Sequence, residues 1–223
     1  MNTADSAERG SPRYYPVALR IAGRRCLVVG GGKVAERKVR ALLAAGGQVC
    51  VVSPELTPAL QEHAARGDID WHPRGFVDAD LDDCWIVVGA TRDPAVNQAV
   101  SRGALARGRL VNIVDEPSLC NFIVPASCEL GPVTFTISTA GTSPALAGWL
   151  RKRLEAEYGP ALGIFAGLLG EVRDEVKARV AGEEARRAVW EAILNSTALE
   201  LVRQGRIAEA RETIRACISS PSD

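Results

Sequence analysis

The sequence has 223 residues, of which 47% are hydrophobic, so it can bury the core of one domain together with a smaller second one. Lys and Arg together number 27 and so do Asp and Glu, which argues against binding nucleic acid through bulk positive charge. The cysteines form no CxxC pair, and no apolar run approaches the roughly 20 residues that span a bilayer. We therefore expect a cytoplasmic protein with reduced cysteines, no resident metal, no nucleic-acid partner and no membrane partner.

The amino-terminal residues carry little structural information. Residues 1–12 are polar and small and end in a proline, which predicts a loose tail without the apolar core of a signal peptide. Residues 14–23 fit either an edge strand or a lead-in segment before the first buried strand. Neither part is assigned a function.

A strand, a tight glycine turn and a helix follow. Residues 26–29 form a short apolar run, and Gly30, Gly31 and Gly32 interrupt it before apolar residues recur at helical spacing. Glycines allow the backbone to turn and to approach a pyrophosphate, whose charge the free N–H groups at the helix start attract. The pattern predicts dinucleotide binding here, although a purely structural turn is an alternative reading.

The next hundred residues alternate between strand and helix. Further strands are predicted at residues 49–52, 69–72, 85–88 and 110–114, with helical patterns at 55–66 and 94–107. This alternation predicts an α/β fold with an open parallel sheet, that is, a Rossmann-type domain over residues 13–116.

Ligands of such sheets bind outside the carboxyl ends of the strands, so these ends supply the candidate cofactor contacts. Besides the glycines, the candidates are Ser53, Thr91 and Asn112. Ser53 stands where the ribose-binding residue is usual, and Glu55 would repel a 2′-phosphate, so the predicted cofactor is NAD. Alternatively, Ser53 only starts a turn before Pro54.

Asp115 is the predicted catalytic base, because the last strand of the sheet ends on it near the expected position of a nicotinamide. The alternative is that Asp115 caps the turn before Pro117. Glu116 is a weaker candidate for the same role.

Beyond residue 117 the pattern changes. Residues 122–125 and 133–137 resemble two strands of an antiparallel ribbon, which is marginal alone and would pack on the neighbouring domain or on a second copy of the chain. We therefore predict a small β dimerisation segment over residues 117–143 and a symmetric homodimer. Residues 144–223 form a predicted C-terminal helical domain with amphipathic segments at 165–180, 186–201 and 207–218.

Four side chains are candidates for binding an acidic substrate. Thr142 and Ser143 precede a helix that Pro144 opens, where free N–H groups can hold an anion, although capping explains them as well. Arg151 belongs to a charge run that can equally be a solvated helix face. Arg92 is better placed, because it follows a strand end at Thr91.

Four runs of sequence together resemble one family. They are VVGGGKVAERKVRALLAAGGQVCVVSP, VVGATRDPAVNQ, LVNIVDEPSLCNFIVPA and FTISTAGTSPALAGWLRKRLE, in the order and spacing found in precorrin-2 dehydrogenases and in the dehydrogenase/ferrochelatase part of siroheme synthases. The resemblance implies NAD-linked oxidation of precorrin-2 to sirohydrochlorin, followed in some members by ferrous iron insertion. It also implies a homodimer with a swapped middle segment.

The resemblance also assigns residue roles. The aspartate credited with both activities is Asp115 here, and the implied cofactor contacts are Lys33, Val34, Pro54 and Glu55. Thr139 replaces a serine that is phosphorylated in some members.

Two other functions fit the residues. One is a non-catalytic dinucleotide sensor that signals through its carboxyl-terminal helices. The other is an NAD-dependent reductase of a different small molecule.

Overall fold

The computed structural model describes residues 14–219, so the predicted loose tail at residues 1–12 lies outside the described residues. The chain divides into two compact units, the first reaching Val124 and the second beginning at Pro125.

The first unit contains a five-stranded, fully parallel sheet with the strand order β3-β2-β1-β4-β5. The order reverses between β1 and β4, where the crevice for a ligand of such a sheet opens. The strands are β1 (Arg25–Val29), β2 (Gln48–Val52), β3 (Ile69–His72), β4 (Ile86–Gly89) and β5 (Leu110–Ile113).

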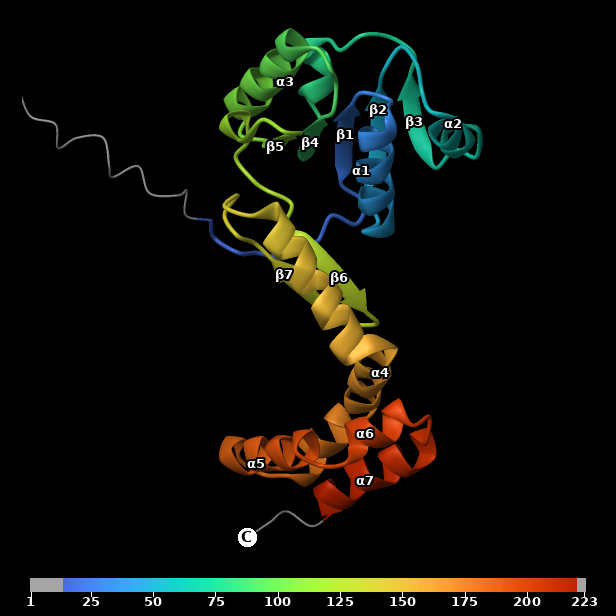
Figure 1. Ribbon diagram of the computed structural model, residues 1–223, viewed down its shortest axis with the longest axis vertical. Helices are drawn as coiled ribbons and strands as arrows, with labels where there is room; N and C mark the ends of the chain where they lie inside the picture. The colour runs from blue at the N-terminus through green and yellow to red at the C-terminus, as the bar shows by residue number, and fades with distance from the viewer. Residues whose placement is uncertain (1–13, 220–223) are drawn as a thin grey trace, which may run out of the picture. The chain divides into compact units, whose positions relative to one another are not determined.

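Helices cover both faces of this sheet, and Figure 1 shows α1 lying across β1 and β2. Strand residues alternate between the two faces, so Val28 packs with α1 and α2, whereas Leu27 packs with α3 and the 3₁₀ turn η1. The two buried layers explain why the strands read as continuous apolar runs. The helices are α1 (Lys33–Ala44), α2 (Pro58–Ala65) and α3 (Pro94–Ala106), with η1 (Asp78–Leu81) and η2 (Pro117–Leu119).

Residues 14–24 contain no strand, so of the two alternatives for this stretch the lead-in segment is the one observed. The edges of the sheet are β3 and β5 instead.

The second unit begins with an antiparallel hairpin of β6 (Ala126–Leu130) and β7 (Val133–Ile137). The predicted strand at residues 122–125 is wrong, because its partner pairs with the five residues that follow it. Phe122 instead packs against the core of the first unit, and Pro125 has no N–H to donate to a ladder. The predicted fold class is confirmed: a parallel Rossmann-type sheet, a small β segment and a helical C-terminal part.

The remaining helices are α4 (Pro144–Arg179), α5 (Glu183–Leu194), α6 (Ala198–Arg203) and α7 (Ile207–Ser219). Helix α4 packs on the hairpin through its first half, where Tyr158 stacks on Phe135 with ring centroids 5.6 Å apart. Gly159, with φ of 55°, and Pro160 kink this helix before it enters the C-terminal bundle. The predicted helical segment at 186–201 is divided in two, because the turn at residues 195–197 separates α5 from α6.

Among residues 14–219, no helix combines the length and the apolar character needed to span a lipid bilayer.

Candidate functional site

The glycine turn lies at the point where the strand order reverses. The Gly30 N–H donates to the carbonyl of Val52 at 2.9 Å, and the Ala90 N–H donates to the carbonyl of Val29 at 2.8 Å. A Cβ atom on Gly30 would lie 2.5 Å from the carbonyl oxygen of Ala90, and φ is 121° there. Only glycine fits between the ends of β1, β2 and β4.

The start of α1 is open toward an anion. Gly32 is the N-cap and has no side chain to occupy the first N–H groups of the helix, which begins at Lys33 and Val34. A Cβ atom on Gly32 would meet no atom of the described residues within 4 Å. The predicted contacts Gly32, Lys33 and Val34 therefore surround free space at a helix N-terminus, which fits a pyrophosphate.

Glu36 is a buried carboxylate that the sequence reading missed. Its Oε2 atom accepts hydrogen bonds from Lys33 Nζ at 3.1 Å and from Thr57 Oγ1 at 3.0 Å, while Oε1 lies 3.4 Å from Arg40 Nη2. These donors, led by Lys33 and Thr57, hold the pKa of the Glu36 carboxyl below its usual value. Glu36 thus ties the first turn of α1 to the start of α2.

The turn after β2 presents Glu55 rather than Ser53. Ser53 is buried, and its hydroxyl donates to the carbonyl of Glu55 at 2.7 Å. Its role in shaping the turn before Pro54 is therefore visible, whereas the carboxylate of Glu55 is exposed and available to a ribose. The carbonyl of Gly31 accepts from the Thr57 N–H at 2.9 Å, which fixes this turn against the glycine turn.

Thr91 and Arg92 follow β4 at the same edge. The Thr91 hydroxyl lies 3.0 Å from Oδ1 of the buried Asn97, and the Asn97 amide donates back to the Thr91 carbonyl at 3.2 Å. Asn97, on α3, therefore holds the turn in shape, and sequence spacing gave no signal for it. Arg92 is exposed next to this turn.

The N–H of Val114 donates to the carbonyl of Gly89 at 2.9 Å, just beyond β5. Asp115 is the next residue, so it lies at the same carboxyl edge of the sheet. Its φ is 61°, an unusual conformation for a residue other than glycine. The carboxylate is exposed and makes no hydrogen bond within residues 14–219, which disfavours a capping role. Asn112 is turned away, because its amide donates to the Phe122 carbonyl at 3.2 Å.

Lys38 is the second residue that the sequence reading missed. Burial and neighbouring Arg37 lower the pKa of its ammonium group below the usual value. The negative charge of Asp115 opposes this lowering to a smaller extent. Its signal in the sequence is the AERK run one turn beyond the glycines.

The other predicted substrate contacts lie in the second unit. Ser143 caps α4, because its hydroxyl accepts from the Leu146 N–H at 3.1 Å. Thr142 is exposed beside it. Arg151 forms an ion pair with Glu155 on the same helix. Thr142 and Ser143 lie at the start of α4, whereas Arg151 lies roughly two turns further along the helix.

Cys50, Asp70 and His72 have potential metal-ligand atoms within 4.8 Å of one another. However, Arg25 Nη2 lies 3.8 Å from the Asp70 carboxylate, and Arg74 Nη2 lies 3.1 Å from His72 Nδ1. Guanidinium groups already supply the positive charge that a metal ion would bring, so we assign no metal to this cluster.

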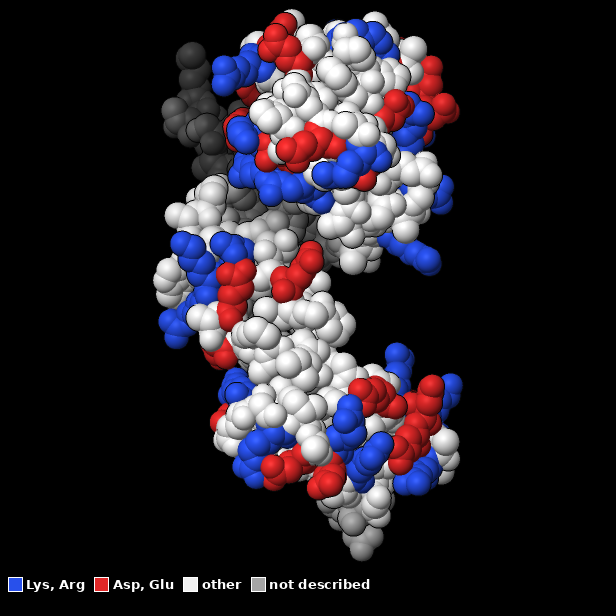
Figure 2. Space-filling view, turned by 90° about the vertical axis from the view of Figure 1, so that its right-hand side faces the viewer, with Lys and Arg blue, Asp and Glu red and all other residues white. Residues whose placement is uncertain are grey.

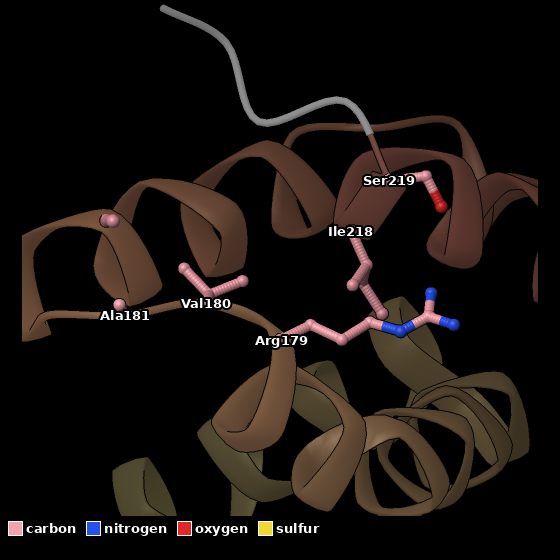
Figure 3. Close-up of a pocket in the computed structure, with 6 residues that line it drawn as sticks. Arg179, Val180, Ala181, Ile218 and Ser219 are labelled. Atoms are coloured by element: carbon pink, nitrogen blue, oxygen red, sulfur yellow. The ribbon is translucent and has the colours of Figure 1, made fainter.

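The second unit has a hollow of about 530 Å³ between the ends of α4 and α7. Figure 3 shows the Arg179 side chain extending past Ile218, with Val180 facing the same space. Ser219, which lines the hollow, is the last residue that the structure describes. We assign no ligand to this hollow.

Opposite charges are interspersed on each unit in the view of Figure 2, in keeping with the zero net charge. An acidic ligand must therefore be held by local groups rather than by the field of the whole protein.

Two family models match the chain. The one described as putative NAD(P)-binding matches residues 17–126, and the one described as the sirohaem synthase dimerisation region matches residues 161–218. The second match lies beyond the segment 117–143 to which the sequence reading assigned dimerisation.

Curated relatives and a solved structure agree with these matches. The siroheme synthase of Thioalkalivibrio sulfidiphilus is 43% identical over 210 residues, covering 94% of this chain and 43% of that protein. The siroheme synthase of Nitrosococcus oceani is 39% identical over 206 residues, and the match covers 92% of this chain and 44% of that protein. The chain thus spans less than half the length of these relatives. The solved structure of SirC, a precorrin-2 dehydrogenase, matches this structure with a TM-score of 0.77 at 26% sequence identity. The match covers 92% of this chain and 98% of the SirC chain. Nearly the whole chain is thus similar both to SirC and to a part of the siroheme synthases.

Proposed function

We propose that this protein oxidises precorrin-2 to sirohydrochlorin with NAD as the electron acceptor. The observation that carries the proposal is the meeting of an open glycine turn and an uncommitted carboxylate at one sheet edge. Gly30 and Asp115 both follow strands that flank β4, and the similarity to the precorrin-2 dehydrogenase SirC supports this reaction.

Each group at the edge has a part in this reaction. NAD, when bound, supplies the hydride acceptor. The N–H groups at the start of α1 hold its pyrophosphate, and Glu55 accepts from the ribose hydroxyls. Oxidation removes one hydride and one proton from the tetrapyrrole, and the Asp115 carboxylate takes the proton. Arg92 is available to a substrate carboxylate.

The test mixes the purified full chain with precorrin-2 and NAD and follows NADH absorbance together with the sirohydrochlorin spectrum. The proposal expects both to appear in equal amounts. Binding of NAD without turnover would support the sensor alternative, and turnover only with other compounds would support the general reductase. Adding ferrous iron to the product mixture tests for siroheme formation by the same chain.

We further propose that the protein is a homodimer. Support comes from the match to a dimerisation region at residues 161–218 and from large apolar side chains exposed in the second unit, among them Trp149, Ile164 and Leu194. Light scattering of the purified chain tests this proposal. A mass of one chain at micromolar concentration would contradict it.

A further inference from the structure

A cavity of about 400 Å³ opens in the first unit where the parallel strands begin. Because β1, β4 and β5 all start at this edge, the residues just before them gather there: Arg24 before β1, Trp85 before β4 and Arg109 before β5. The glycine turn and Asp115 follow the opposite ends of these strands. This cavity is therefore separate from the proposed dinucleotide site.

The lining of the cavity is strongly basic. Three arginines, Arg24, Arg25 and Arg109, face a single acidic side chain, Asp83. Arg25 lies 3.8 Å from the carboxylate of Asp70. Within residues 14–219, neither Arg24 nor Arg109 makes an ion pair. The guanidinium groups of Arg24 and Arg109 thus have no carboxylate within ion-pair distance among the described residues.

Both of these guanidinium groups are held in place by the protein. The Cζ atom of Arg24 lies 5.6 Å from the ring centroid of Trp85, in a cation–π contact. Arg109 is half-buried and its Nη2 donates to the carbonyl of Asp82 at 2.5 Å. Their positions are therefore organised before any ligand arrives, which lowers the cost of binding.

Arg109 also has an unsatisfied donor. Its Nε atom is buried and finds no hydrogen-bond partner in the part of the chain that the structure describes. A buried N–H without an acceptor is unfavourable, and such groups are rare in native proteins. The described residues therefore leave part of the hydrogen-bonding capacity of Arg109 unfilled.

We propose that this cavity binds the phosphate group of a small metabolite or inorganic phosphate itself. A phosphate group carries between one and two negative charges at neutral pH, which matches the two unpaired guanidinium groups better than one carboxylate does. The planar donor fork of arginine suits phosphate oxygens. Binding at the amino edge of the sheet leaves the carboxyl edge free, so phosphate and NAD bind at the same time.

The test is calorimetric titration of the full chain with inorganic phosphate at constant ionic strength, adjusted with sodium chloride. Saturable binding is expected, weakened at least tenfold in Arg109→Gln and in Arg24→Gln. The matched control is Arg102→Gln, which removes an exposed arginine of α3 and leaves binding unchanged. Absence of saturable binding, or equal binding by all variants, would overturn the proposal. Arg24 is exposed, so its replacement keeps the test valid if Arg109→Gln folds poorly.

Two further arms identify the ligand and the site. Titration with pyrophosphate and with a nucleoside monophosphate distinguishes free phosphate from a larger phosphate ester. Tighter binding of citrate than of every phosphate compound would overturn the assignment to phosphate. The titration is repeated with saturating NAD, and loss of phosphate binding there would place phosphate on the glycine turn and overturn the proposal.

Discussion

A Cβ atom on Gly31 would lie 1.9 Å from the carbonyl oxygen of Glu55. The glycine turn after β1 and the turn after β2 are therefore in backbone contact, and the Gly31 carbonyl accepts from the Thr57 N–H beyond it. The turn proposed to bind phosphate and the carboxylate proposed to bind ribose are thus built as one structure.

This contact predicts different outcomes for two neighbouring glycines. Gly31→Ala forces the turn away from Glu55 and lowers the free energy of unfolding by about 1–3 kcal/mol, as overpacking does. Gly32→Ala leaves stability nearly unchanged, because its φ of −85° and open surroundings accept a methyl group, but weakens NAD binding at least about tenfold. Thermal melts and NAD titrations of both variants check this. Normal NAD affinity in Gly32→Ala would contradict the placement of the pyrophosphate.

The exposed carboxylate of Glu55 predicts a preference for NAD over NADP. Glu55→Gln removes the repulsion of a 2′-phosphate and improves use of NADP by about 3- to 10-fold, or about 0.7–1.4 kcal/mol. The measurement is kcat/KM with each cofactor. Glu62→Gln, an exposed change on α2, is the control and keeps the wild-type ratio. An unchanged ratio in Glu55→Gln would show that another group selects the cofactor.

We expect Glu36 to contribute to the loss of folding stability at low pH. Its pKa is lowered in the folded state, so it stabilises the protein above the unfolded-state pKa of about 4.3 and loses this contribution as the pH falls through the folded-state value. Between about pH 5 and about pH 3, Glu36→Gln should therefore lose less stability than the wild type. Thermal melts over this range test the difference, and parallel curves for the two proteins would exclude it.

Replacing Asn97 is expected to lower the stability of the protein, because this side chain holds the turn after β4. Asn97→Ala removes the hydrogen-bond partner of the Thr91 carbonyl, while the Thr91 hydroxyl keeps its bonds to Asp93, and lowers the free energy of unfolding by about 1–3 kcal/mol. Gln98→Ala, on the exposed side of the same helix, changes it little. Chemical denaturation of the two variants makes the comparison. Equal stabilities would mean that the Asn97 bonds contribute nothing.

The sheet was predictable because its strands are buried on both faces and appear as uninterrupted apolar runs, such as residues 49–52. The first strand of the hairpin was predicted at residues 122–125, a few residues before its actual position, because this stretch is as apolar as a strand. Phe122 instead packs against the core of the first unit. Local pattern cannot tell these two uses of an apolar run apart.

The positions of Asp115 and the glycine turn could be predicted, because ligands of parallel sheets bind at the carboxyl ends of the strands. The residues that hold this edge in shape, such as Glu36, could not be predicted. Glu36 meets Thr57 across 21 positions of sequence. Such contacts depend on how α1 packs, which spacing along the chain does not reveal. Ser53 was assigned to the ribose on spacing alone, and its hydroxyl is occupied within the turn.

The central claim is that Asp115 takes the proton while NAD takes the hydride. Single-turnover oxidation of precorrin-2 by Asp115→Asn tests it, because asparagine accepts the same left-handed backbone but cannot act as the base. We expect unchanged NAD binding with NADH formation slowed by about 100-fold or more, and near-normal rates in the control Glu116→Gln. Wild-type NADH formation by Asp115→Asn would contradict it.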